Sequence, residues 1–105
     1  MRSQNELQIA DMLVDAGIEY EYESLVIEYA NGRTYTPDFV TDEYVIEVKG
    51  VHFGEIYDRA TTGKQKAEAA MKQLDSREYV VVGVELPADV YIPWTERNKL
   101  VELLG

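Results

Sequence analysis

The stretch that decides the fold reads Thr36-Pro37-Asp38-Phe39-Val40, followed after three residues by Tyr44-Val45-Ile46-Glu47-Val48-Lys49-Gly50. Side chains two residues apart on an extended strand project from the same face. Glu47 and Lys49 therefore share one face with Val45. Ile46 and Val48 occupy the opposite face. Apolar residues on both faces indicate a central strand that is covered on both sides.

Asp38 adds a second carboxylate to this strand. It follows Pro37 on a preceding short strand, and it lies beside Glu47 if the two strands are neighbours. A buried charge must be paired or must hold a metal ion. Two carboxylates in one pocket repel each other, and a divalent cation relieves that repulsion. The stretch therefore predicts a cation site between Asp38 and Glu47.

Length and composition predict one domain, spanning residues 1–105. A chain of 105 residues with 46% hydrophobic residues can bury a single core. Because the sequence holds no cysteine, disulfides, thiolate zinc sites and cysteine nucleophiles are excluded. Any metal ligand must then be an oxygen atom or His52. We find neither an apolar run long enough to span a membrane nor the apolar core of a signal peptide, so we expect a cytoplasmic protein with no membrane partner.

The net charge of −10 argues against a nucleic-acid partner, because phosphate binding depends on lysine and arginine. The charge is nevertheless segregated. Residues 59–77 hold five basic and two acidic residues, or +3, which leaves −13 on the remainder. Two interpretations stay open: an ordinary solvated helix, or a basic helix that faces DNA. In the second, the acids Glu19, Glu21, Glu23 and Glu28 face solvent, and the contacts to DNA come from Arg59, Lys64, Lys66 and Lys72.

Ser3 to Ala16 has the apolar periodicity of an amphipathic helix, which Gly17 ends. Glu6 is the charged residue that falls within its apolar half. Two interpretations are possible. Ser3-x-x-Glu6 has the form of a capping box, in which the glutamate bonds back to the first turn. Alternatively, Glu6 is a third carboxylate directed at the pocket of Asp38 and Glu47.

The remaining segments predict an α/β fold with a mixed sheet of four to five strands, flanked by helices. Strands are expected at residues 18–23, 25–29, 33–40, 79–84 and 90–92, and helices at 61–74 and 95–104, the last one capped by Thr95. The turn residues Asn31-Gly32 indicate a hairpin, so residues 25–50 form a meander that brings Asp38 towards Glu47. A helix between two buried strands indicates a parallel crossover.

This arrangement resembles the PD-(D/E)XK nuclease superfamily, whose motif reads here Pro37-Asp38 and Glu47-Val48-Lys49. The order of elements is similar to the restriction-endonuclease-like core. The first half of the chain most resembles the phage endonuclease I group, which resolves four-way DNA junctions. Four segments carry that resemblance: Ser3-x-x-Glu6, Gly17-Ile18-x-Tyr20-x-Tyr22-Glu23, Thr34-Tyr35-Thr36-Pro37-Asp38-Phe39 and Glu47-Val48-Lys49-Gly50.

The resemblance implies a metal-dependent endodeoxyribonuclease that acts as a homodimer on branched DNA. It also implies that the protein is encoded by a phage. Mg²⁺ or Mn²⁺ would be held by Asp38, Glu47 and the carbonyl of Val48, with Glu6 as a further ligand. Lys49 would orient or help to deprotonate the attacking water. The catalytic residues would thus be Glu6, Asp38, Glu47 and Lys49, and the products a 5′-phosphate and a 3′-hydroxyl.

Two other functions fit the same residues. The first is a nicking or partner-directed nuclease on linear DNA, in which a protein partner supplies the DNA affinity that an acidic chain lacks. The second is a non-catalytic, acidic interaction module that retains the nuclease fold, with Glu47 and Lys49 as a structural ion pair. Divalent binding separates the second from a nuclease, because a structural ion pair gains no stability from Mg²⁺.

Overall fold

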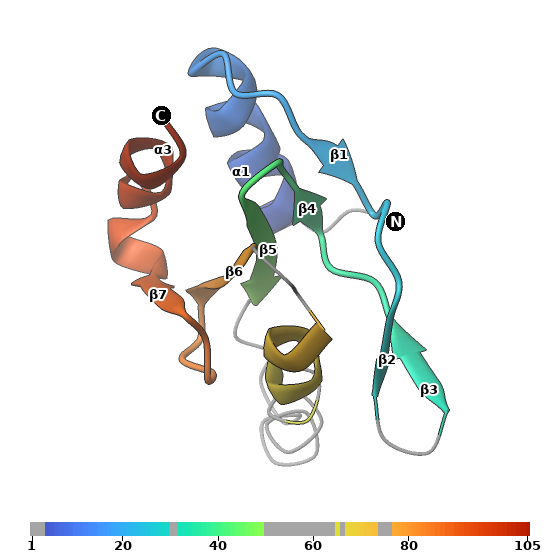
Figure 1. Ribbon diagram of the computed structural model, residues 1–105. Coiled ribbons are helices and arrows are strands. Elements are labelled where there is room, and N and C mark those ends of the chain that lie inside the picture. Colours follow the sequence, from blue (N-terminus) through green and yellow to red (C-terminus); the bar gives the residue numbers. More distant parts are fainter. Residues whose placement is uncertain (1–3, 30–31, 50–64, 66, 74–76) are drawn as a thin grey trace.

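The computed structural model describes residues 4–29, 32–49, 65, 67–73 and 77–105 (Figure 1). Five strands form a mixed sheet in the order β1-β4-β5-β6-β7. Their bounds are β1 Glu21–Tyr22, β4 Phe39–Val40, β5 Tyr44–Lys49, β6 Glu78–Gly83 and β7 Val90–Pro93. A separate hairpin joins β2 Ile27–Tyr29 to β3 Arg33–Tyr35. The helices are α1 Gln4–Asp15, α3 Lys99–Leu104, a 3₁₀ turn η1 Trp94–Glu96, and the helical residues 67–73.

The predicted central strand is confirmed. β5 lies third of five in the sheet, antiparallel to β4 and parallel to β6. The parallel pairing with β6 confirms the predicted crossover. The apolar run of β6 is fully buried from Val80 to Val82, as expected of a strand covered on both faces.

The alternation along β5 separates two cores, one on each face of the sheet. Ile46 and Val48 pack with Ile9 and Leu13 of α1 and with Leu100 of α3. On the opposite face, Val45 packs against residues of the hairpin, of β6 and of the helical residues 67–73, namely Ile27, Tyr35, Tyr79, Val81, Ala67 and Ala70. Figure 1 shows β5 in the middle of this arrangement, between the helices α1 and α3 and the helical residues 67–73.

The predicted meander of one sheet is wrong in one respect. Residues 33–40 do not form one strand but divide into β3 and β4, which belong to different sheets. Pro37 lies between them and has no backbone N–H to continue a ladder. The segment at 18–23 is likewise reduced to the two residues of β1. Thr36, Pro37 and Asp38 therefore form a short link from the hairpin to the main sheet.

The last predicted helix begins later than expected. Thr95 lies within η1, and Asn98 is the residue before α3, so Thr95 does not cap that helix. Trp94 packs against the core on the α1 side, and the guanidinium of Arg97 lies 4.8 Å from its ring centroid. This packing anchors the C-terminal segment on that core. Ser3, the first residue of the capping-box interpretation, lies outside the described residues.

Candidate metal centre

Asp38 is held at the end of β5 by the pairing of β4 with that strand. Phe39 pairs with Ile46 and Val40 with Val45, so one further step in this register brings Asp38 opposite Glu47. The amide of Val48 donates a hydrogen bond of 2.7 Å to Asp38 Oδ2. The side chain of Asp38 is only 8% exposed. The predicted neighbourhood of Asp38 and Glu47 is thus present, and a backbone amide fixes the orientation of Asp38.

Glu6 reaches the same place from the first turn of α1. Its side chain is only 9% exposed, although glutamates are seldom buried. Its Oε1 accepts a hydrogen bond of 3.2 Å from the hydroxyl of Tyr22 in β1. The prediction that Glu6 points towards the core is therefore confirmed, and its carboxylate lies with that of Asp38.

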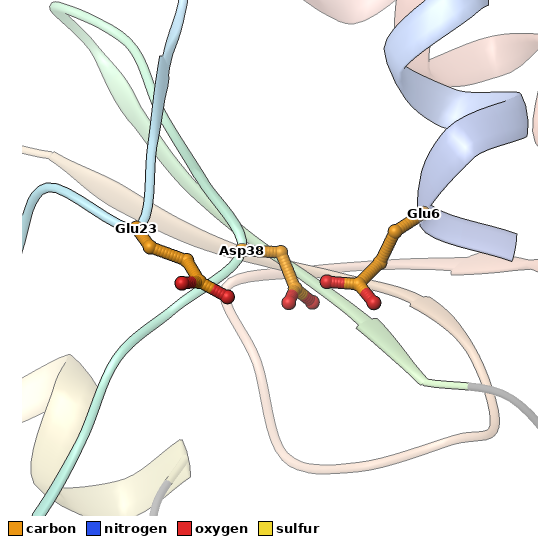
Figure 2. A group of neighbouring side chains, drawn as sticks. All are labelled: Glu6, Glu23 and Asp38. Carbon is orange, nitrogen blue, oxygen red and sulfur yellow. The ribbon is translucent and has the colours of Figure 1, made fainter. Parts of the chain in front are cut away.

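Glu23 provides a further carboxylate at this site. The sequence pattern predicts that Glu23 faces solvent, as Glu19 and Glu21 do. Its φ angle is 52°, a left-handed conformation that is rare for glutamate. Its amide donates a hydrogen bond of 3.1 Å to the carbonyl of Asp38. Figure 2 shows Asp38 between Glu23 and Glu6, and one carboxylate oxygen of each residue lies within 4.8 Å of the other two. The residue is exposed overall, yet its carboxylate turns into the cluster.

One signal in the sequence indicates the change of direction at Glu23. The alternation of apolar and acidic residues from Ile18 onwards stops there, because the polar Ser24 occupies the next apolar place. The end of an alternating pattern marks the end of a strand. The side chain of a residue beyond that end is not restricted to one of the two faces of the sheet. We refer below to Glu6, Glu23, Asp38 and Glu47 as the acidic cluster.

The carboxyl of Asp38 is the electrostatic centre of the acidic cluster. Burial raises its pKa far above the ordinary value of 3.8, and the charge of Glu47 and hydrogen bonding to Glu6 add to that shift. The hydrogen bond from Val48 opposes it. Burial, hydrogen bonding to Glu23 and the charge of Glu6 also raise the pKa of the Tyr22 hydroxyl. A buried group of carboxylates must therefore retain a proton or acquire a cation at neutral pH.

The donor set suits a hard divalent cation. It consists of carboxylate oxygens that converge from three separate segments of the chain, and oxygen is the ligand that Mg²⁺, Mn²⁺ and Ca²⁺ prefer. Lys49 ends β5 and, by alternation, shares the face of Glu47. Val48 contacts Asp38 through its amide nitrogen, and the role expected for its carbonyl oxygen stays a prediction.

The predicted DNA-binding residues fall mainly outside the described part of the chain. Arg59, Lys64 and Lys66 lie there, as does His52. Lys72 is exposed on the helical residues 67–73. It borders a groove of about 590 Å³ between this helix and the hairpin, lined also by Glu28, Tyr29, Gly32, Gln65, Glu68, Ala69 and Gln73.

A second hollow, of about 970 Å³, lies at the opposite end of β5. It is lined by Tyr44, the first residue of that strand, and by Ile18, Tyr20 and Leu104. Its other lining residues include the acids Glu19, Glu21, Asp42 and Glu43. The candidate residues belong to the end with the acidic cluster.

No known family model, curated protein or solved structure matches this chain. Among the described residues, we find no helix with both the length and the apolar composition needed to cross a membrane.

Proposed function

We propose that this chain is a divalent-metal-dependent endodeoxyribonuclease with a restriction-endonuclease-like core, of the PD-(D/E)XK type. One observation carries the proposal: Asp38, fixed by the amide of Val48, is buried beside Glu47 and between the carboxylates of Glu6 and Glu23. A sheet that is held together by packing has no need of four carboxylates in one place. Their burial is explained if the folded chain binds a cation there.

Each residue then has a distinct task. Asp38 and Glu47 hold the cation, with the carbonyl of Val48 and with Glu6 as further ligands. A bound divalent cation lowers the pKa of a water molecule and offsets the charge that develops on a phosphate. Lys49, at the end of the same strand face, would orient the attacking water or help to deprotonate it. Water adds to phosphorus while the bond to the 3′ oxygen breaks, which leaves a 5′-phosphate and a 3′-hydroxyl.

Branched DNA is the proposed substrate, and the phage endonuclease I group of junction resolvases is the proposed relationship. A resolvase cuts two strands symmetrically, so the protein would act as a homodimer. The Mg²⁺ or Mn²⁺ ions would be the cofactors, and Lys72 would belong to the DNA contacts with Arg59, Lys64 and Lys66.

The charge of the chain favours a second candidate function on the same chemistry. At −10, the molecule repels DNA unless a cation or a basic partner intervenes. A nuclease that nicks or cuts linear DNA when a partner protein brings it there would tolerate such a charge. This candidate keeps every residue role and changes only the substrate.

The test is a cleavage assay on a labelled four-way junction, a linear duplex of the same arm sequence, and a single strand. Each substrate is incubated with Mg²⁺, Mn²⁺ or EDTA. Wild type is compared with Lys49→Ala and with Lys99→Ala, an exposed lysine of α3 that pairs with Glu96. We expect paired cuts near the junction in Mg²⁺, none in EDTA, at least a 100-fold slower rate for Lys49→Ala and an unchanged rate for Lys99→Ala.

Two other results would favour a different function or contradict the proposal. Metal-dependent cuts in the linear duplex alone would favour the partner-directed nuclease. Equal rates for wild type and Lys49→Ala would show that the cleavage comes from a contaminant or from different residues, and would contradict the proposal.

A further inference from the structure

Two buried tyrosines form a hydrogen-bonded pair on the face of the sheet that carries Glu47. The hydroxyl of Tyr35 donates to that of Tyr79 over 2.7 Å. Tyr35 is 8% exposed and Tyr79 is 1% exposed. Tyr35 ends β3, so this bond joins the hairpin to β6 of the main sheet. Packing alone needs neither hydroxyl, since phenylalanine fills nearly the same space.

The strand register places this pair close to Glu47. Tyr79 pairs with Val45 in the parallel ladder, and Glu47 lies two residues beyond Val45 on the same face. Tyr79, Val45 and Tyr35 share one core cluster. Burial is the main cause that raises the pKa of both hydroxyls, and the charge of Glu47 raises each of them further. The two hydroxyls therefore lie within the electrostatic field of that carboxylate.

The number of hydroxyl hydrogens determines the direction of hydrogen bonding in the tyrosine pair. A tyrosine hydroxyl donates one hydrogen and accepts others. Tyr35 directs its hydrogen to Tyr79, so the hydrogen of Tyr79 must point to another acceptor. Buried hydroxyls are hydrogen-bonded with few exceptions, and a carboxylate is the strongest acceptor available on this face.

We propose that Tyr35 and Tyr79 are positioning residues for Glu47: Tyr79 donates its hydrogen to the Glu47 carboxylate and so orients it towards the cation. Tyr35 in turn orients the hydroxyl of Tyr79. The pair acts through Glu47 and touches neither the cation nor the DNA. The hairpin then supports two carboxylates. It supports Asp38 through the backbone, because Tyr35 is only three residues before Asp38, and it supports Glu47 through the two tyrosine hydroxyls.

This inference rests on the proposed function, because it assumes that Glu47 is a cation ligand. Hydrogen-bond partners of ligands typically change metal affinity by roughly 10- to 100-fold when they are removed. Each tyrosine can be tested by replacement with phenylalanine, which deletes only the hydroxyl.

The experiment is a calorimetric titration of Mn²⁺ into folded wild type, Tyr79→Phe, Tyr35→Phe and the control Tyr20→Phe. Tyr20 is a part-buried tyrosine that packs edge-on against Phe39 in the core on the opposite face. We expect Tyr79→Phe to bind Mn²⁺ about 10-fold more weakly, Tyr35→Phe a few-fold more weakly, and Tyr20→Phe as wild type does. If Tyr79→Phe does not fold, Tyr35→Phe interrupts the same chain from its other end.

A second measurement separates positioning from simple stability. Urea unfolding in EDTA is followed for wild type, Tyr79→Phe, Glu47→Gln and the double variant. If Tyr79 acts on Glu47, the effects of the two single changes are not additive. Additive effects together with wild-type Mn²⁺ affinity in Tyr79→Phe would overturn the inference and leave the proposed function intact. A wild type that binds no Mn²⁺ would overturn both.

Discussion

Glu23 has a backbone conformation that costs free energy, and both its side chain and its backbone amide make contacts from that conformation. An L-residue in the left-handed region loses about 1 kcal/mol relative to glycine. At φ 52°, this residue directs its carboxylate to Glu6 and Asp38 and its amide to the carbonyl of Asp38. The strain and the contribution to the acidic cluster can therefore be measured separately.

We expect Glu23→Gly to be more stable than Glu23→Ala by about 1 kcal/mol in EDTA, because glycine adopts this conformation without strain. Both variants lose the same carboxylate, so both should bind Mn²⁺ several-fold more weakly than wild type. Urea unfolding and calorimetric titration check the two effects. Glu21→Ala, an exposed acid of β1, is the control and should leave Mn²⁺ binding unchanged. Equal stability of the glycine and alanine variants would contradict the strain.

The raised pKa of Asp38 predicts how metal-free stability depends on pH. Its folded-state pKa lies above the unfolded value of 3.8 because of burial and the charge of Glu47. The folded state therefore binds the proton of Asp38 more tightly than the unfolded state does. The contribution of Asp38 to the free energy of unfolding is largest below about pH 4, and it decreases as the pH rises towards the folded-state pKa.

Asp38→Asn should remove that loss, because an amide cannot ionise and still accepts a hydrogen bond from Val48. In EDTA at pH 8, we expect this variant to be more stable than wild type by about 2 kcal/mol, and the difference to shrink at pH 5. Urea midpoints at the two pH values provide the measurement. With saturating Mg²⁺ the order should reverse if Asp38 is a ligand, because the variant lacks its carboxylate. A difference independent of pH would argue against a proton on Asp38.

At the scale of elements, Gly83 sets the distance between β5 and β6 where the candidate site lies. It pairs with Lys49 and has a φ of 121°; a Cβ atom there would lie 2.0 Å from the Lys49 carbonyl oxygen. The Tyr91 hydroxyl also donates to the carbonyl of Gly83 over 2.7 Å. A side chain at this position must therefore push apart the strand ends that hold Lys49.

We expect Gly83→Ala to lower the free energy of unfolding by about 3 kcal/mol or more, from the backbone conformation and the contact together. Gly32→Ala is the matched control, since Gly32 also has a left-handed φ of 79° but a Cβ atom there meets nothing within 4 Å. Its loss should be about 1 kcal/mol. Denaturant unfolding compares the two, and equal losses would show that the contact with Lys49 is relieved at little cost.

The elements that the sequence predicts well are those whose pattern has one interpretation. β5 and β6 are confirmed because apolar residues on both faces admit only a central place, and a helix between them requires a crossover. The split of residues 33–40 was not predictable from alternation, since alternation gives the face of each residue but not the sheet to which it belongs. Glu23 is exposed, as the alternation predicts, but its left-handed φ turns its carboxylate towards Asp38 and Glu6, which alternation does not predict. Glu6 and Asp38 were predictable because a charge within an apolar pattern needs a reason.

On the scale of the whole molecule, the acidic cluster joins segments that are distant in sequence. Glu6 belongs to α1, Glu23 follows β1, Asp38 precedes β4 and Glu47 lies in β5. A cation bound to the folded state alone stabilises it by about 2.7 kcal/mol at 100 times its Kd. For a domain of this size, we expect Mg²⁺ or Ca²⁺ to raise Tm by roughly 10 °C.

Differential scanning calorimetry with the divalent cation and with EDTA checks this expectation. Asp38→Asn should show a much smaller rise, and Lys99→Ala the full rise of wild type. The same Tm in EDTA and in Mg²⁺ for wild type would remove the basis for a metal centre.

The parallel pairing of β5 with β6 also fixes an order in time during synthesis. The four carboxylates lie within residues 6–47, whereas the strand that completes the pairing of β5 ends at residue 83. Until that strand leaves the ribosome, β5 has one open edge, and the mutual repulsion of the acids opposes the approach of β4 and α1. We therefore expect the nascent chain to bring the four carboxylates together only after residue 83 has been made.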